Sequence, residues 1–497
     1  MHYYNPIIKG FNPDPSICRV GKDYYLVTSS FEYSPGIPIY HSRDLVNWTQ
    51  IGNCVRRPEE FPMENVKDSG GIWAPTIRYH KGLFYVTATL EGYGNFIITA
   101  ENPAGEWSSP VWVPMGGIDP SLLFEDGKAY YCTNETLNPG NEEITLAEID
   151  VETGELIGEQ RTIWNGIGGG FLEAPHIYII DEWYYLIAAE GGTNFNHMIT
   201  MARSRTIWGP YENCPRNPIL TNAHDTSKEV QCSGHGDLLQ DHLGNWWIVH
   251  LGIRLSRRTM SNLGRETFLT PVIWEDGWPV VDNNRKATLV CEGPLWAKQE
   301  HARGLSVDFS QTHWEPEWIF LRRPIPSSYK REKGKLKMYP TTVTFKDGKS
   351  PTFAAIRQKD FVCETNVEYV FEPCQIGDEA GIAILLASNF YYSIAKRRTS
   401  KGDFLVVDKI AEDFHQEAYC QPIADGTLRL KIQADKEYYT FYFSVGESPF
   451  QEICRASTRF LSCEIAGKCF TGTVIGIYAV STTATEAVME VTGFSMK

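Results

Sequence analysis

The sequence lacks the features that mark several large classes of protein. Its 497 residues contain no apolar run close to the roughly 20 residues that a membrane-spanning helix needs. Residues 1–6 show no basic stretch leading into an apolar one, so no secretion signal is visible. The 12 cysteines form no C-x-x-C pair, which is typical of free thiols in a reducing compartment. We therefore expect a cytoplasmic protein without a membrane partner.

Basic clusters and nucleotide-binding motifs are also missing. The net charge is −15, from 61 acidic and 46 basic residues, and the basic residues are not clustered. Such a composition disfavours nucleic acid and anionic membranes as partners. The glycine-rich stretch at residues 166–170 is not followed by a helical pattern, so we interpret it as a loop and not as a phosphate-binding motif.

A repeated pattern of aromatic doublets occupies the first 300 residues. Each doublet stands in a short apolar strand directly after a Gly, Asp or Asn turn, which is typical of a β-hairpin. The doublets are Tyr24-Tyr25, Phe84-Tyr85, Tyr130-Tyr131, Tyr184-Tyr185 and Trp246-Trp247. Five hairpin units of roughly 50 residues predict a five-bladed β-propeller, with a large sandwich of irregular hairpins as the alternative.

The strand before each turn repeats as well, and its first residue has functional consequences. The innermost strands of a propeller surround its axis, so residues at equivalent repeat positions converge there. The converging residues are Asp14, Ala74, Asp119, Ala174 and His235, with Trp73 and Glu173 one position earlier in two repeats. An Asp before Pro is also a common turn starter, and a Glu in an apolar stretch is costly unless it is functional. The repeated register favours the functional interpretation.

Clustered carboxylates restrict the chemistry of such a site. No Ser–His or Cys–His pair accompanies them, which disfavours acyl transfer, and His235 stands alone without transition-metal spacing. Glycoside hydrolysis needs two carboxyl groups, one to protonate the leaving oxygen and one to activate water or attack carbon. A third carboxylate can raise the pKa of the acid by repulsion.

Six ordered motifs resemble glycoside hydrolase family 43, and their combination is similar to the two-domain β-xylosidases of that family. They are Asn12-Pro13-Asp14-Pro15-Ser16, Trp73-Ala74-Pro75, Ile118-Asp119-Pro120-Ser121, Glu173-Ala174-Pro175-His176, Ser233-Gly234-His235-Gly236-Asp237 and Leu263-Gly264-Arg265-Glu266-Thr267-Phe268. The resemblance covers the first 300 residues closely and the rest loosely.

The resemblance implies an inverting hydrolase and a role for each residue. Asp14 resembles the general base, Glu173 the general acid, and Asp119 the residue that tunes and orients that acid. Arg265 resembles an arginine that contacts xylose hydroxyls and Asp119. His235 resembles the ligand of a channel-bound ion, usually calcium, that is held largely through water. Phe31 and Trp73 resemble walls of the terminal-sugar pocket.

The repeat stops near residue 300, and a second domain follows. We predict a propeller over residues 1–300, a linker over 301–325 rich in Trp and Pro, and a jelly-roll-like β-sandwich over 326–497, because short alternating strands dominate there. In the resembled enzymes this domain places a phenylalanine over the active site, and Phe470 matches that place. An ordinary core phenylalanine is the alternative.

The function implied is an exo-acting hydrolase that releases xylose from the non-reducing end of β-1,4-xylo-oligosaccharides. An α-L-arabinofuranosidase, or an enzyme with both activities, is the alternative within the class. A carbohydrate-binding propeller without catalysis is the alternative from another class. The sequence leaves open whether the chain forms a homo-oligomer.

Overall fold

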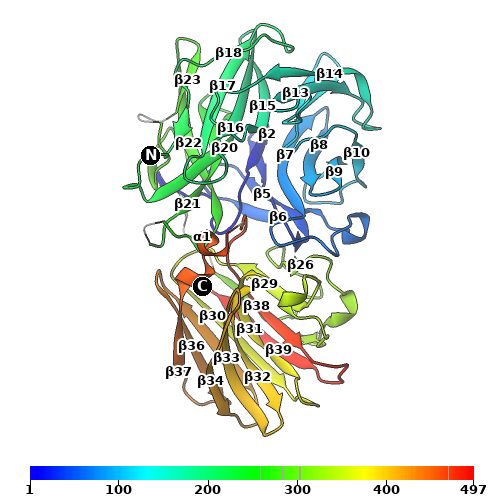
Figure 1. Cartoon of the computed structure of the whole chain (residues 1–497), viewed down its shortest axis with the longest axis vertical. Coiled ribbons are helices and arrows are strands. Elements are labelled where there is room, and N and C mark those ends of the chain that lie inside the picture. The colour runs from blue at the N-terminus through cyan, green and yellow to red at the C-terminus, as the bar shows by residue number, and fades with distance from the viewer. Residues whose placement is uncertain (258, 282–284, 301–303, 468) are drawn as a thin grey trace.

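The chain folds into two domains composed almost entirely of β-strands (Figure 1). The computed structural model describes residues 1–497 except 258, 282–284, 301–303 and 468. Helical segments in the described part are short: η1 (Pro58–Glu60), η2 (Pro326–Ser328), η3 (Phe345–Asp347), η4 (Thr458–Leu461) and α1 (Cys463–Ala466). None of the described helices is long and apolar enough to cross a membrane.

Five antiparallel sheets form the N-terminal domain, and each runs outward in chain order. The blades are β2 (Ser16–Val20), β3 (Asp23–Val27), β5 (Gly36–Ser42) and β6 (Thr49–Val55); β7 (Ile72–His80), β8 (Leu83–Leu90), β9 (Gly94–Ala100) and β10 (Val111–Val113); β11 (Ser121–Glu125), β12 (Lys128–Thr133), β13 (Ile144–Ile149) and β14 (Leu156–Trp164); β15 (Glu173–Ile180), β16 (Trp183–Glu190), β17 (Met198–Ser204) and β18 (Glu212–Asn213), with β19 (Leu220–Thr221) also on β17; and β20 (Val230–Gln240), β21 (Trp246–Arg254), β22 (Arg265–Glu275) and β23 (Trp278–Val281).

The first strands β2, β7, β11, β15 and β20 each contact the next around a closed ring. All five aromatic doublets lie on the second strand of their blade. Their aromatic and β-branched side chains suit a pleated surface that is buried between blades. Separate apolar clusters fill the spaces between neighbouring blades. The predicted five-bladed propeller is therefore confirmed.

The start of the chain closes the propeller. Strand β1 (His2–Tyr4) pairs with β24 (Val290–Glu292), which follows the last blade. Ile8 forms a bridge with Thr267 on β22, and the Asn12 amide donates to the Arg265 carbonyl. These contacts hold the segment before Asp14 against the fifth blade.

The C-terminal domain is a sandwich of two antiparallel sheets, as predicted. Sheet one contains β27 (Tyr329–Glu332), β28 (Lys335–Met338), β39 (Met489–Met496), β30 (Cys363–Phe371), β35 (Leu428–Ala434), β36 (Tyr438–Val445) and β37 (Gln451–Ser457), with β25 (Leu305–Val307) also on β39. Sheet two contains β29 (Thr352–Arg357), β38 (Val474–Val480), β31 (Glu379–Ala387), β32 (Phe390–Thr399), β33 (Gly402–Ala411) and β34 (Phe414–Pro422). Their inner faces share one large apolar core.

The segment predicted as a linker, 301–325, belongs to both domains over the part that the structure describes. Residues 301–303 lie outside the described residues, and β25 pairs within the sandwich. Strand β26 (Phe320–Leu321) instead pairs with β4 (Tyr33–Ser34) of the propeller. Trp318 joins the sandwich core, whereas the adjacent Ile319 joins the cluster shared with the propeller. Alternation of side chains along an extended segment thus attaches the two domains to each other.

Candidate active site

The five equivalent repeat positions share an unusual backbone conformation. Their φ angles are 56° at Asp14, 21° at Ala74, 54° at Asp119, 56° at Ala174 and 48° at His235. Positive φ costs a non-glycine residue roughly 1–3 kcal/mol and is concentrated at functional sites. In β7, β15 and β20 the ladder register also shifts at this point, as bulges do where a side chain is re-aimed.

Four of these positions, Asp14, Ala74, Asp119 and His235, line one pocket of about 120 Å³, and at the fifth the preceding residue, Glu173, does so. Every residue that the sequence predicted for the site lines it: Asp14, Phe31, Trp73, Asp119, Glu173, His235, Arg265 and Phe470. The carboxylates come from the first, third and fourth blades, which places them far apart in sequence and together in space.

Asp14 is buried and is surrounded by donors and positive charge. Its carboxylate accepts from the Ser29 hydroxyl at 2.5 Å and from Arg265 Nη1 at 3.1 Å, and His235 Nδ1 lies 3.6 Å away. Burial alone would raise the pKa of Asp14, but Arg265, His235 and Ser29 outweigh it and hold that pKa below its ordinary value. Asp14 is therefore ionised across the neutral range.

Asp119 and Glu173 have the opposite electrostatic character. Burial, with repulsion from Asp14, raises the pKa of Glu173 to about 7. Burial, with repulsion from Glu173 and Asp14, raises the pKa of Asp119 well above its ordinary range. Two such carboxyls titrate as a pair, and the pair retains a proton near neutral pH. The site thus combines one ionised carboxylate with a proton-holding pair.

Arg265 differs in one contact from the sequence-based expectation. The resemblance implied a contact with Asp119, but in the described residues its side chain donates to Asp14, to Thr193 Oγ1 at 2.9 Å and to the Phe470 carbonyl at 3.1 Å. Arg265 acts on Asp119 only through its charge, which lowers the pKa of that carboxyl. Asp14 receives the hydrogen bond because both residues lie next to the blade closure, where the Asn12 amide donates to the Arg265 carbonyl.

The sandwich contributes Phe470 to the pocket. Its ring lies 6.1 Å from that of Phe31 and 6.2 Å from that of Trp73, centroid to centroid. Its amide donates to Ser69 Oγ at 2.9 Å. The backbone next to it approaches the propeller so closely that a Cβ on Gly472 would lie 2.1 Å from the Leu263 carbonyl oxygen. This close approach fixes Phe470 over the pocket, as the sequence predicted.

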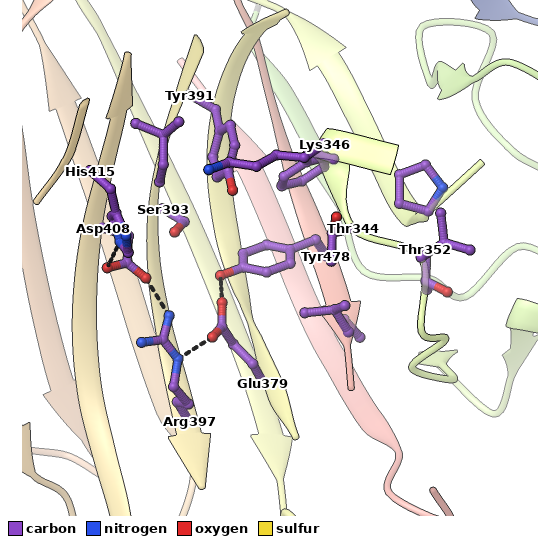
Figure 2. A pocket seen from close by; sticks show the side chains of 16 residues that line it. Thr344, Lys346, Thr352, Glu379, Tyr391, Ser393, Arg397, Asp408, His415 and Tyr478 are labelled. Atoms are coloured by element: carbon purple, nitrogen blue, oxygen red, sulfur yellow. Dashed lines mark hydrogen bonds and ion pairs between the residues drawn. The ribbon is translucent and has the colours of Figure 1, made fainter. Parts of the chain in front are cut away.

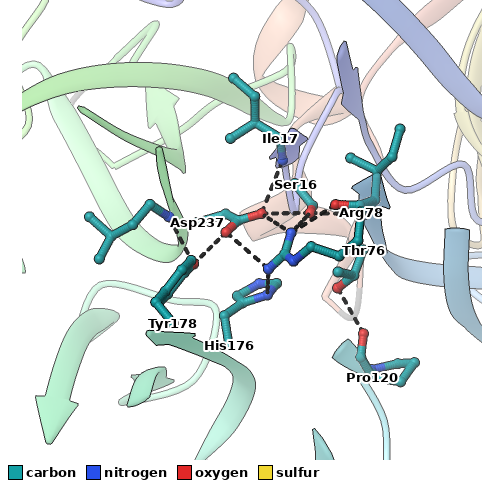
Figure 3. Close-up of polar contacts among 10 residues, drawn as sticks. Ser16, Ile17, Thr76, Arg78, Pro120, His176, Tyr178 and Asp237 are labelled. Atoms are coloured by element: carbon teal, nitrogen blue, oxygen red, sulfur yellow. Dashed lines mark hydrogen bonds and ion pairs between the residues drawn. The ribbon is translucent and has the colours of Figure 1, made fainter. Parts of the chain in front are cut away.

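A second layer of polar side chains lies two to four residues further along the inner strands (Figure 3). Asp237 accepts from Ser16 Oγ at 2.6 Å, from Arg78 Nη1 at 2.9 Å and from the Tyr178 hydroxyl. Arg78 also contacts His176 Nδ1 at 2.9 Å. Although burial opposes it, Arg78 and His176 hold the pKa of Asp237 far below its ordinary value. This layer is a saturated ion-pair network directly beside the pocket.

The calcium ion that His235 is predicted to hold, largely through water, stays a prediction. Calcium takes six to eight oxygen ligands. Within the described residues, no group of three or more His, Cys, Asp or Glu side chains is placed to hold a metal. Burial lowers the pKa of His197 to about 3, and its Nε2 is a buried acceptor without a partner in the described chain, which suits a water molecule. The calcium prediction therefore depends on the resemblance alone.

Sequence reasoning missed three residues of the site. Thr193 and His197 line the pocket, and Ser29 bonds Asp14. Thr193 follows Gly191-Gly192 at the end of β16, and this turn is the signal that could have identified it. Ser29 lies just after β3 and His197 just before β17, outside the repeated first strands on which the prediction was based.

Comparisons with known families and proteins agree with this architecture. The model described as "Glycosyl hydrolases family 43" matches residues 3–279. The chain belongs to glycoside hydrolase family 43. A second model, "Beta xylosidase C-terminal Concanavalin A-like domain", matches residues 306–497. The resemblance drawn from the six motifs is thus confirmed, and the chain is a glycosidase of this family.

Proteins similar to this chain are named as arabinofuranosidases, as xylosidases or as both. A Bacteroides ovatus protein named as a non-reducing end α-L-arabinofuranosidase is 40% identical over 492 residues, covering 96% of this chain and 91% of its own. A Butyrivibrio fibrisolvens xylosidase/arabinosidase is 36% identical, covering 96% and 95%. The solved structure of a xylan β-1,4-xylosidase from Bacillus halodurans has a TM-score of 0.95 at 31% identity, covering 99% of each chain.

Proposed function

We propose that this chain is an exo-acting, inverting hydrolase that removes a single terminal pentose from the non-reducing end of short oligosaccharides. Asp14 acts as the general base, Glu173 as the general acid, and Asp119 as the partner that keeps the acid protonated. The observation that carries this proposal is the opposite displacement of pKa values, lowered at Asp14 and raised at Asp119 and Glu173. Environments that separate the pKa values of neighbouring carboxyls assign the acid and base roles.

The mechanism follows from these protonation states. Ionised Asp14 takes a proton from a water molecule as the oxygen of that water attacks the anomeric carbon. Glu173 gives its proton to the glycosidic oxygen as the bond to the leaving group breaks. Arg265 anchors Asp14 and leaves further N–H donors for sugar hydroxyls. Neither carboxyl forms a covalent bond with the sugar, so configuration inverts.

Phe470 supports the exo mode of action. A propeller mouth alone would be an open surface on which a polymer could lie across the site. The rings of Phe31, Trp73 and Phe470 wall a pocket of about 120 Å³. That volume is below the ~300–1,000 Å³ of ordinary ligand sites and suits one small sugar ring.

The first proposed substrate is a β-1,4-xylo-oligosaccharide. A terminal α-L-arabinofuranose is the second candidate, and the 40% identical Bacteroides ovatus relative that is named as an arabinofuranosidase specifically favours it. A third candidate is an enzyme that releases both xylose and arabinose from the same pocket, which a relative named as a xylosidase/arabinosidase favours.

A side-by-side assay on xylobiose, arabinan, arabinoxylan and the two matching nitrophenyl glycosides tests this proposal. Release of free xylose from xylobiose supports the first candidate, and faster release of arabinose supports the second. Xylobiose left intact, with sugar binding retained, would instead favour a non-catalytic binding propeller.

A further inference from the structure

A second hollow lies in the sandwich domain, outside the catalytic pocket. It measures about 280 Å³, larger than the catalytic pocket, and lies on the outer face of sheet two. Alternation along β31 explains its position: Ile382 and Ile384 face the sandwich core, whereas Ala383 and Leu385 face outward and join the cluster shared with the propeller. Glu379 lies on the same outward face at the start of β31 and lines the hollow.

A polar chain crosses the base of this hollow (Figure 2). Five adjacent strands each contribute one residue: Tyr478 from β38, Glu379 from β31, Arg397 from β32, Asp408 from β33 and His415 from β34. In this order, each side chain is hydrogen-bonded to the side chain on the neighbouring strand. His415 Nε2 lies 3.0 Å from Asp408 Oδ1. These links fix planar charged groups in place before any ligand arrives.

Aromatic and hydroxyl groups form the walls. The Phe345 ring of η3 packs against Tyr391 at 4.9 Å and against Tyr478 at 5.5 Å. Thr344 and Ser393 add hydroxyls to the lining. Figure 2 shows Lys346 extending from the same turn toward Tyr391. The hollow therefore combines flat apolar rings with fixed polar groups.

The unfilled hydrogen-bonding capacity indicates the class of ligand. Arg397 has five N–H donors, and within the described residues three of them donate to carboxylates, those of Glu379, Asp408 and Glu417. The Tyr391 hydroxyl has no hydrogen-bond partner in the described chain, and each carboxylate keeps free lone pairs. Three carboxylates surround the one guanidinium, which disfavours an anionic ligand. A neutral ligand whose groups both donate and accept fits this arrangement.

We propose that this hollow is a non-catalytic binding site for a neutral sugar unit, separate from the catalytic pocket. Sugar rings present apolar faces for Phe345 and Tyr391 and hydroxyls for Arg397, Glu379 and Asp408. The volume of about 280 Å³ lies just below the ~300–1,000 Å³ range of ligand sites, which leaves room for one sugar unit. Such a site would hold part of a carbohydrate on the same sheet face that joins the propeller.

Calorimetric titration of the full chain tests this site. In a hydrolysis-deficient Asp14→Asn background, xylobiose should bind at two sites per chain. Tyr391→Phe should weaken the second site roughly three- to tenfold, the loss expected for one hydrogen bond. Tyr438→Phe, at a half-exposed tyrosine on sheet one, is the matched control and should change neither site. With Asp14 intact, the Tyr391→Phe variant should hydrolyse aryl xylosides at the rate of the wild-type protein.

Three outcomes would overturn the inference. One is a single site per chain for xylobiose, arabinobiose and cellobiose alike. Another is a second site that is insensitive to Tyr391→Phe. The third is inorganic phosphate binding that depends on Tyr391 while the sugars do not bind there. Because hydrolysis is measured separately, failure of this site and failure of the proposed catalytic function give different results.

Discussion

The two polar layers at the propeller axis arise from the same five strands and behave in opposite ways. The layer with Asp14, Asp119 and Glu173 lines the pocket, and no hydrogen bond to the Glu173 carboxyl is found within the described residues. The layer with Asp237 lies two to four residues further along, where Ser16, Arg78 and Tyr178 all donate to one carboxylate. A saturated carboxylate is held ionised and inert, whereas an unsaturated one next to like charges is available to exchange protons.

The difference shows how a repeat can separate chemistry from stability. Positive φ at the first repeat position accompanies a pocket-lining side chain at Asp14, Asp119 and His235, whereas the Asp237 network holds the inner strands together. We therefore expect substitutions in the pocket layer to alter the reaction, and substitutions in the Asp237 layer to alter folding.

Substitutions of the pocket carboxylates should give the largest effects. Glu173→Ala should reduce cleavage of xylobiose by about 10²–10⁴-fold, the usual contribution of a general acid, and should affect activated aryl xylosides far less, because only poor leaving groups need protonation. Asp14→Ala should impair both substrate types alike, since water must be activated in each case. Steady-state kinetics across leaving groups measures this contrast, and equal losses for Glu173→Ala would reassign the acid.

Asp237→Asn should act on stability. It leaves Arg78, whose side chain is 17% exposed, without its counter-charge, and removing one partner of a buried pair costs about 3–5 kcal/mol. Denaturant unfolding should show this loss, while kcat of the folded fraction changes little. Glu182→Gln, which breaks an exposed pair with Arg205, is the control and should cost less than about 1 kcal/mol. A stable Asp237→Asn protein would contradict the division between the layers.

Asp119→Asn should shift the pH profile. In the native pair, burial and repulsion from Glu173 and Asp14 keep the pKa of Asp119 well above its ordinary range, so the pair retains a proton near neutral pH. In the native protein, burial and repulsion from Asp14 raise the pKa of Glu173 to about 7, and loss of the Asp119 charge should lower that pKa. Activity requires the protonated acid, so the basic limb of kcat/KM should move to lower pH. An unmoved limb would mean that Asp119 acts only by positioning.

Phe470→Ala should have the smallest effect, since Phe470 belongs to neither layer. We expect a several-fold rise in KM for xylo-oligosaccharides, with less change for a small aryl xyloside, if the Phe470 ring contacts the sugar of the leaving group as proposed. Polymeric xylan offers a further check. Early release of mixed oligosaccharides from xylan by the native enzyme would show an open groove and would contradict the exo pocket.

The sequence predicted the blades and the pocket because both depend on a repeated register. The doublets such as Tyr24-Tyr25 mark the second strands, and the residue 10 or 11 positions earlier marks the axis. It did not predict that Arg265 bonds Asp14, because that contact depends on how the fifth blade packs beside the first. Nor did it predict that β39, the last strand, lies between β28 and β30, because pairing between distant segments leaves no local pattern.

Stereochemistry tests the central claim most directly, namely that Asp14 activates water while Glu173 donates the proton. Inversion requires their carboxyls to be roughly 6.5–9.5 Å apart, with room for that water between the base and the sugar. Proton NMR of the first turnovers on a β-xyloside should show α-xylose, which then mutarotates. Initial formation of β-xylose would mean that a carboxylate attacks the sugar, and the assignment of Asp14 as a base would be wrong.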